Sequence, residues 1–349
     1  MKKSVKLADI ARKSNLSTST VSLVLRGKPG IPHETRQRVL RVARQLGYRP
    51  RKSVRAAVNA RRQGGGTLRT VGLIVKTEPQ VAPQANPFYA HVLAGIESAC
   101  RQQRIDLLYA TLPVDENNVP GEVPRLLSET PLDGLLLVGI FVDDVLQHLL
   151  LDKEIPVVLV DAYSAADRYD AVVSDNSYGA GRAVHYLVGR GHRHIGFIGG
   201  GANAYPSLRE RRQGYAQAMR EHALTPVFAD CLPQPEAVAL QARRLLDQQP
   251  QLTAWVGCND EVAAAALRTA QAAGRNVPRD LSLIGFDDIE LAAHLMPPLT
   301  TLHLDKAGMG RMAMQLLAQR VQFPQTERLV AVIRPRLVER ESVADCWSE

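Results

Sequence analysis

The sequence contains few cysteines and no long apolar run, and each shortage excludes a class of protein. Its 349 residues include only four cysteines, none in a Cys-x-x-Cys pair, which excludes a zinc ribbon and a disulfide scaffold and favours a reducing compartment. No run approaches about 18 apolar residues, and no apolar stretch follows the basic start MKKSVK, so we expect neither a membrane-spanning helix nor a signal peptide. The length favours two or three domains. Together, these absences predict a soluble, cytoplasmic protein.

Acidic residues are nearly absent from the first 62 positions. This segment has 17 Lys and Arg against only Asp9 and Glu34, a net charge of +15, whereas residues 63–349 carry −7. A basic segment beside an acidic body is typical of a protein with a polyanionic partner. From charge alone, three interpretations stay open: nucleic acid, an anionic lipid surface, or a basic surface that is simply solvated.

The apolar spacing of residues 7–46 predicts three short helices. Leu7, Ile10 and Ala11 share one face of the first helix, which ends near Ser14 and Asn15. Ser17 is the expected N-cap of the second helix. That helix turns Val21, Val24 and Leu25 inward and leaves Thr18, Ser19, Ser22 and Leu23 on other faces. The third helix starts near Pro32, stops at Gly47 and buries Val39, Val42, Ala43 and Leu46. Such a trio predicts a helix-turn-helix, whose second helix enters the major groove of DNA.

Three runs in this segment are specific: STVSLVLRG at Ser19–Gly27, TRQRV at Thr35–Val39 and LGYRP at Leu46–Pro50. Together they resemble the DNA-binding head of the LacI/GalR family of bacterial transcription regulators. The resemblance implies a sequence-specific regulator, most often a repressor, that binds a pseudo-palindromic double-stranded DNA operator. It also implies a homodimer or a dimer of dimers, located in the cytoplasm at the nucleoid.

The resemblance further implies roles for residues of the second helix. Thr18 and Ser19 match the first two base-reading positions of the family, and Leu23 matches the third, where arginine is common. Positions that usually hydrogen-bond phosphates are matched by Ser17, Thr20 and Ser22. Because leucine offers only apolar contact, for example to a thymine methyl, we expect the operator to lack the guanine that arginine reads. The alternative is that Leu23 touches no base.

Residues 51–69 are expected to form a hinge helix and a flexible linker. The cations of this segment are Arg51, Lys52, Arg55, Arg61 and Arg62. In the family the hinge helix orders on DNA, and a leucine wedges the minor groove open. Ala57 matches that position here, so we expect weaker kinking, with phosphate contacts from the cations in compensation. Two alternatives remain open: Val58 as the wedge, or a solvated basic tether.

From residue 71 onward, short apolar runs alternate with helical segments. The expected strands are Val71–Val75, Ile105–Ala110, Gly134–Val138, Pro156–Val160, Ala171–Val173, Ile195–Ile198, Ala254–Gly257 and Leu281–Phe286. The expected helices include Ala90–Gln103, Tyr178–Arg190, Glu210–Glu221 and Glu261–Ala273. This alternation predicts parallel sheets covered on both faces. Eight strands exceed one comfortable sheet, so we expect two doubly wound subdomains with a ligand in the cleft between them.

The family resemblance continues through this body, for example in GHRHIGFIGG at Gly191–Gly200 and in the long run at Val277–Thr301. It implies a core like that of periplasmic sugar-binding proteins. The predicted fold class is therefore α/β, with an all-α helix-turn-helix head and two doubly wound parallel-sheet subdomains. The expected domains are a head at 1–50, a hinge and linker at 51–69, a core at 70–340 and a tail at 341–349. Within the core we expect an N-subdomain of about 70–174 plus 305–333 and a C-subdomain of about 175–304 plus 334–340.

The resemblance also implies a small-molecule effector, with a carbohydrate as the expected class. Its contacts are matched by Arg211, Asn259 and Asp287, with Phe88 and Asp161 as weaker candidates. A guanidinium beside carboxylates suits vicinal hydroxyls, because each hydroxyl both donates and accepts. Neighbouring Asp260 and Asp288 are expected instead to cap the helices that follow them. Val138, Leu304 and Lys306 replace polar or aromatic residues of a lactose-type pocket, which argues against a galactoside, and Lys306 would admit an anionic ligand such as a sugar phosphate.

No catalytic or metal-binding pattern accompanies these residues. Neither Gly-x-Ser-x-Gly nor His-Glu-x-x-His occurs, and the Gly199–Gly201 run lacks the lysine of a phosphate-binding loop. His192 and His194 lack a third ligand at suitable spacing. We therefore expect no enzyme activity, no cofactor and no metal. The alternatives are a transport-type sugar-binding protein, which would lack the basic head, and a sugar-processing enzyme with an appended DNA-binding head, which would need a catalytic constellation.

Overall fold

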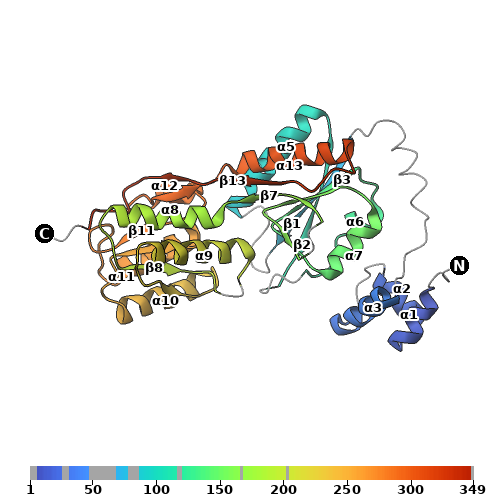
Figure 1. Ribbon diagram of the computed structural model, residues 1–349, viewed down its shortest axis with the longest axis horizontal. Helices are drawn as coiled ribbons and strands as arrows, with labels where there is room; N and C mark the ends of the chain where they lie inside the picture. The colour runs from blue at the N-terminus through green and yellow to red at the C-terminus, as the bar shows by residue number, and fades with distance from the viewer. Residues whose placement is uncertain are drawn as a thin grey trace. The chain divides into compact units, whose positions relative to one another are not determined.

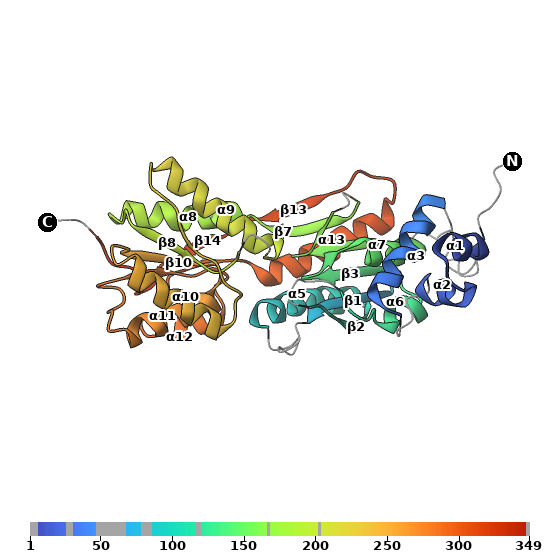
Figure 2. The same cartoon turned by 90° about the horizontal axis from the view of Figure 1, so that it is seen from below.

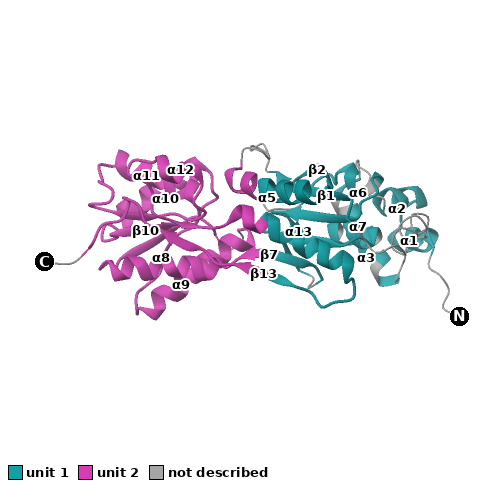
Figure 3. Cartoon of the chain, turned by 90° about the horizontal axis from the view of Figure 1, so that it is seen from above, with its two compact units in different colours: residues 1–85, 93–172, 310–330 teal, residues 86–92, 173–309, 331–349 magenta. Residues whose placement is uncertain are grey.

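The computed structural model describes residues 6–25, 31–46, 68–77, 86–115, 120–165, 168–201 and 204–346. The chain divides into two compact units, which Figure 3 colours separately. Unit 1 comprises residues 1–85, 93–172 and 310–330, and unit 2 comprises residues 86–92, 173–309 and 331–349. Each unit is thus assembled from stretches that lie far apart in the sequence. The division into head, linker, core subdomains and tail stays a prediction.

Three helices form the head, at the start of the chain in Figure 2. They are α1 (Leu7–Ser14), α2 (Thr18–Leu25) and α3 (His33–Leu46). The first helix ends where Asn15 adopts a left-handed backbone with φ of 55°, a conformation that asparagine tolerates better than most residues. The inward residues meet in one small core, in which Ile10, Val21 and Val39 are fully buried. The predicted trio of helices is therefore confirmed.

A six-stranded sheet has the strand order β13-β7-β5-β3-β1-β2, and its strands β1, β2, β3 and β5 lie wholly in unit 1. Its strands are β1 (Thr70–Thr77), β2 (Asp106–Pro113), β3 (Gly134–Val138), β5 (Val157–Val160), β7 (Asp170–Ser174) and β13 (Val330–Ile333). The strands from β7 to β2 pair in parallel with their neighbours. The central strands β3 and β5 are buried along their whole length, as expected for a parallel sheet covered on both faces.

The helices that accompany this sheet include α5 (Pro87–Gln103), α6 (Arg125–Glu129), α7 (Asp144–Lys153) and α13 (Lys306–Gln322). Helices α5 and α13 lie side by side, and the Sγ of Cys100 on α5 is 3.8 Å from the Sδ of Met314 on α13 (Figure 1). Helix α13 packs so closely on β3 that a Cβ on Gly134 would lie 2.8 Å from Leu317. Two short strands, β4 (Phe141–Val142) and β6 (Tyr163–Ser164), form a separate parallel pair.

Unit 2 contains a four-stranded parallel sheet with the order β11-β10-β8-β9. Its strands are β8 (Ile195–Ile198), β9 (Val227–Ala229), β10 (Ala254–Gly257) and β11 (Ser282–Ile284). Its helices include α8 (Asn176–Gly189), α9 (Pro206–Glu221), α10 (Pro235–Gln248), α11 (Asp260–Ala272) and α12 (Glu290–His294). Strands β12 (Thr301–His303) and β14 (Arg336–Val338) pair antiparallel beside them.

The predicted α/β architecture is confirmed. Each of the eight expected strands coincides with an observed strand to within a few residues. The expected strands did not include β4, β6, β9, β12, β13 or β14, which are two to four residues long. None of the helices in the described ranges combines the length and the hydrophobicity needed to span a bilayer.

Candidate functional site

Helix α2 presents the residues that the sequence assigns to DNA. Ser17, Thr18, Ser19 and Leu23 are exposed, the last at 36%, and Thr20 and Ser22 are half-buried. The hydroxyl of Ser17 accepts the backbone N–H of Thr20 at 3.0 Å, which confirms Ser17 as the N-cap of α2. The predicted hinge contacts Arg51, Lys52, Arg55 and Ala57 lie outside the described residues.

A buried guanidinium, that of Arg211 on α9, is the centre of the candidate effector site in unit 2. Only 4% of Arg211 is exposed. Its Nε donates to the Oδ1 of Asn176 at 2.9 Å, and its Nη1 donates to the carbonyl oxygen of Cys258 at 2.8 Å. Its plane lies over the ring of Phe286, with 3.8 Å from Cζ to the ring centroid. Partners on several sides therefore fix the orientation of this side chain.

The expected ligand residue Asp287 meets Arg211 directly. The Oδ1 of Asp287 lies 2.9 Å from the Nη2 of Arg211, and only 7% of Asp287 is exposed. The two atoms are at ion-pair distance, but Oδ1 lacks a well-aligned hydrogen bond among the described residues. Burial raises the pKa of Asp287, and the positive charges of Arg211 and Lys306 oppose that rise. The site thus holds a donor array and an acceptor side by side in a place shielded from water.

Asn259, the third expected contact, acts as the N-cap of α11. Its Oδ1 accepts the backbone N–H of Val262 at 2.8 Å. The oxygen is therefore committed to the helix, and the Nδ2 amide is the group with which Asn259 would address a ligand.

The expectation that Asp260 and Asp288 cap the helices that follow them is wrong. Asp260 is buried in the first turn of α11, and it accepts the hydroxyl of Thr301 at 2.5 Å and the backbone N–H of Ile289 at 2.8 Å. It therefore holds the start of α12 rather than that of α11, and this partner lies 29 residues away in the chain, where a local pattern cannot reveal it. Burial, followed by the charge of Asp287, raises the pKa of Asp260 to about 7.

The carboxylate of Asp288 contacts two basic side chains instead of a helix end. Its Oδ2 lies 2.7 Å from the Nδ1 of His303, and its Oδ1 accepts from the Nη2 of Arg340 at 2.6 Å. Burial raises the pKa of Asp288, but hydrogen bonds from Arg340 and His303 outweigh burial and leave the pKa lowered.

The two weaker candidates belong to different parts of the chain. Phe88 is buried on α5, and its ring meets the edge of Tyr89 at a centroid distance of 5.3 Å. Asp161 follows β5 in unit 1, is buried, and has a left-handed backbone with φ of 45°. Arg211 and Asp287 belong to unit 2.

Lys306 does not have the surroundings expected of an anion-binding lysine. It is 5% exposed, and its Nζ donates to the backbone carbonyls of Asp287 and Asp288, the latter at 3.1 Å. The ammonium is thus occupied by protein oxygens, and Lys306 does not supply a binding site for a phosphorylated ligand. Leu304 and Val138 are fully buried.

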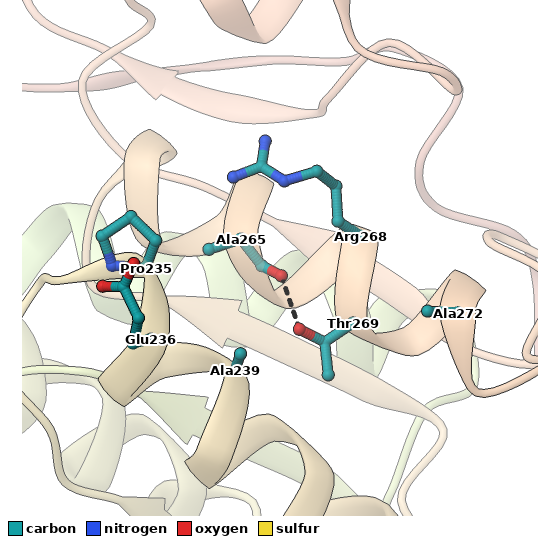
Figure 4. Close-up of a pocket in the computed structure, with 7 residues that line it drawn as sticks. All are labelled: Pro235, Glu236, Ala239, Ala265, Arg268, Thr269 and Ala272. Atoms are coloured by element: carbon teal, nitrogen blue, oxygen red, sulfur yellow. Dashed lines mark hydrogen bonds between the residues drawn. The ribbon is translucent and has the colours of Figure 1, made fainter.

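A separate pocket of about 400 Å³ lies between α10 and α11 in unit 2 (Figure 4). Its lining is formed by Pro235, Glu236, Ala239, Ala265, Arg268, Thr269 and Ala272. The hydroxyl of Thr269 donates to the backbone oxygen of Ala265 at 2.9 Å within the pocket wall. None of the expected effector residues belongs to this lining.

Sequence reasoning did not identify the residues that hold Arg211. Asn176 begins α8, and Cys258 contributes only its backbone oxygen. The guanidinium and its two partners lie on three separate segments, so no spacing in the sequence joins them. Phe286 ends an expected strand just before Asp287, but its stacking on Arg211 emerges only from the fold.

Comparisons with known proteins agree with one another. Residues 6–51 match the domain described as bacterial regulatory proteins, lacI family, and residues 184–343 match a periplasmic binding protein-like domain. A ribose operon repressor of Haemophilus influenzae is 33% identical over 97% of this chain and 98% of its own length. The transcriptional repressor PurR of Vibrio cholerae is 31% identical over the same shares. The solved complex of the transcriptional regulator CelR with cellobiose has a TM-score of 0.70 and 28% identity, over 97% of this chain and 99% of that one.

Proposed function

The chain belongs to the lacI family of bacterial regulatory proteins, and from this premise we propose how its own residues act. It is a DNA-binding transcriptional repressor under the control of a small-molecule effector. Its relatives are repressors and not enzymes. The proposal concerns the identity of the effector, the residues that bind it, and the residues that contact the operator.

The effector in this proposal is a neutral sugar bound by Arg211 and Asp287. The observation that carries it is the buried ion pair of these residues, stacked on Phe286. A guanidinium donor and a carboxylate acceptor only 2.9 Å apart suit adjacent hydroxyls, because each hydroxyl can accept from one and donate to the other. Support comes from a relative named as a ribose operon repressor and from the cellobiose complex of CelR. The Nδ2 of Asn259, the ring of Phe88 and the carboxylate of Asp161 are proposed as further contacts.

The operator in this proposal is read by the exposed face of α2. Thr18, Ser19 and Leu23 address base edges, and Leu23 supplies an apolar contact to a thymine methyl. Phosphates are bound by Ser17, Thr20 and Ser22, and by the hinge residues Arg51, Lys52 and Arg55. Ala57 occupies the minor groove with little kinking of the duplex. Two chains act as a homodimer on two half-sites of a pseudo-palindrome.

The direct test of the effector assignment is calorimetric titration of the purified chain with D-ribose, and with cellobiose and hypoxanthine for comparison. We expect saturable binding of a sugar, and a change in affinity for an operator fragment when that sugar is added. Absence of binding by either sugar, together with binding of the purine, would reassign the effector class while leaving the DNA-binding function in place.

The roles of Arg211 and Asp287 are tested by a pair of variants. Arg211→Met should abolish sugar binding and destabilise unit 2 by roughly 3–5 kcal/mol, because it leaves a buried carboxylate unpaired. The double variant Arg211→Met with Asp287→Asn should regain much of that stability, since no isolated charge remains, but it should not regain binding. Denaturant unfolding and calorimetry separate the two effects. Sugar binding by the double variant at wild-type affinity would refute the assignment.

A further inference from the structure

Two consecutive residues of the proposed effector site have a left-handed backbone. Asp287 has φ of 107° and Asp288 has φ of 51°. Residues other than glycine rarely adopt positive φ because the Cβ atom crowds the backbone, so two in succession persist only where surrounding contacts hold them. The first of these residues carries the carboxylate that faces Arg211. The direction of that carboxylate therefore depends on whatever maintains this turn.

The ammonium group of Lys306 contacts the backbone of both strained residues. Lys306 is the first residue of α13, and its Nζ donates to the carbonyl oxygens of Asp287 and Asp288. An ammonium has three donors and a compact charge, so one group can bridge two carbonyls that point the same way. The contact with Asp287 is buried and the contact with Asp288 is partly buried. Loss of the ammonium would therefore leave at least the Asp287 oxygen without a hydrogen-bond donor, at a place that water does not easily reach.

The other partners of the turn act on different atoms. The backbone N–H of Asp287 donates to the oxygen of Leu302 at 2.8 Å, and the carboxylate of Asp288 is held by His303 and Arg340. These contacts fix the amide of Asp287 and the side chain of Asp288, whereas Lys306 holds the carbonyl oxygens of the two left-handed residues.

We propose that Lys306 is a positioning residue of the effector site, which clamps the Asp287–Asp288 turn and thereby aims the Asp287 carboxylate at the sugar. The inference rests on the proposed role of Asp287 as an effector contact. In this arrangement Lys306 touches no part of the effector. It acts through the backbone, and its charge favours the ionised form of Asp287.

The test compares Lys306→Met and Lys306→Arg with Lys153→Met, a matched loss of a half-buried lysine on α7 in unit 1. Two quantities are measured on the full chain: hydrogen exchange of the peptide that spans residues 285–290, without ligand, and D-ribose affinity by calorimetry. We expect Lys306→Met to raise exchange at this peptide selectively and to weaken D-ribose binding at least tenfold. Lys306→Arg should keep part of the wild-type protection from exchange and part of the D-ribose affinity. Lys153→Met should change neither quantity.

The two readouts separate this inference from the proposed function. If the wild-type chain binds neither D-ribose nor cellobiose, the effector assignment fails, and a selective rise in exchange at residues 285–290 still supports the clamp. If Lys306→Met does not fold, the exchange of the 285–290 peptide is compared between Lys306→Arg and the wild type instead. Unchanged exchange at this peptide, or a uniform rise across unit 2, would overturn the role of Lys306, as would wild-type D-ribose affinity in a folded Lys306→Met protein.

Discussion

At the residue scale, Asp260 is a buried carboxylic acid whose pKa lies near neutrality. Burial raises its pKa from 3.8 to about 7, and the charges of Asp287 and Asp288 add to the rise. The hydroxyl of Thr301 and the N–H of Ile289 oppose it, because both stabilise the ionised form. Lys306 also lies close enough for its pKa to respond to Asp260. A proton on Asp260 is therefore bound more tightly in the folded chain than in the unfolded chain.

The sign of this linkage gives a stability prediction. Because the folded-state pKa is the higher one, the stabilisation from protonated Asp260 is complete below about pH 4 and is lost as the pH rises to about 7. The free energy of unfolding of the wild type should therefore fall relative to Asp260→Asn over this interval, by on the order of a few kcal/mol. Urea denaturation at several pH values measures the difference. Two profiles that stay parallel from pH 4 to pH 7 would contradict the shift.

At the scale of elements, α8 and α9 pack so closely that one glycine is required. Gly214 on α9 lies against α8, and a Cβ there would come within 2.2 Å of the backbone oxygen of Ser177. At Gly181 on α8, by contrast, an added Cβ would meet only ordinary contacts, 3.8 Å from Ala218. The same packing brings Arg211, on α9, to Asn176, on α8, so the fit of these helices also orients the effector site.

The two glycines supply a matched pair of substitutions. Gly214→Ala should destabilise unit 2 by about 1–3 kcal/mol or more, because backbone must move to admit the methyl group. Gly181→Ala should stabilise it by up to about 1 kcal/mol, through the higher helix propensity of alanine. Thermal unfolding of both variants checks the prediction. Equal effects of the two changes would mean that helix propensity, not close packing, dominates at this interface.

At the scale of the whole molecule, charge is concentrated at one end of the chain. The first 62 residues carry a net charge of +15, and the remainder carries −7. Binding to DNA releases counterions from the phosphates that the protein neutralises. The basic segment should therefore make operator affinity strongly dependent on salt, while the acidic remainder should contribute little attraction to the duplex.

This charge distribution predicts a measurable salt slope. With about 6–10 phosphates neutralised, operator affinity should fall roughly 10³–10⁵-fold between 50 and 200 mM salt. Arg51→Ala should reduce the slope by about one phosphate contact for each bound chain, whereas Leu23→Ala should leave the slope unchanged and alter the preferred base at the position that Leu23 contacts. Fluorescence anisotropy with operator and scrambled duplexes measures both. A slope near zero would exclude the electrostatic part of the proposal.

Local patterns were sufficient for the head and for the fold class. The apolar periodicity around Ile10, Val21 and Val39 predicts three helices that each bury one face. Ser17 caps its helix by a hydrogen bond to a residue only three positions away. The apolar runs of β3, β8 and β10 were equally clear, because strands buried on both faces are continuously apolar. Strand β9 is only three residues long and two of its residues are half-buried, so its apolar pattern is too weak to be recognised.

The sequence by itself therefore determined which segments form helices and buried strands, where positive charge gathers, and which side chains are candidates for DNA and effector. These properties follow from periodicity, capping and composition, which act over a few residues. Only the tertiary structure decided that Lys306 holds a backbone turn, that Asp260 supports α12, and that Asn176 orients Arg211. Those contacts join residues that are 18 to 35 positions apart in the sequence. A buried polar group must form a hydrogen bond, and its partner comes from whichever segment the fold places beside it.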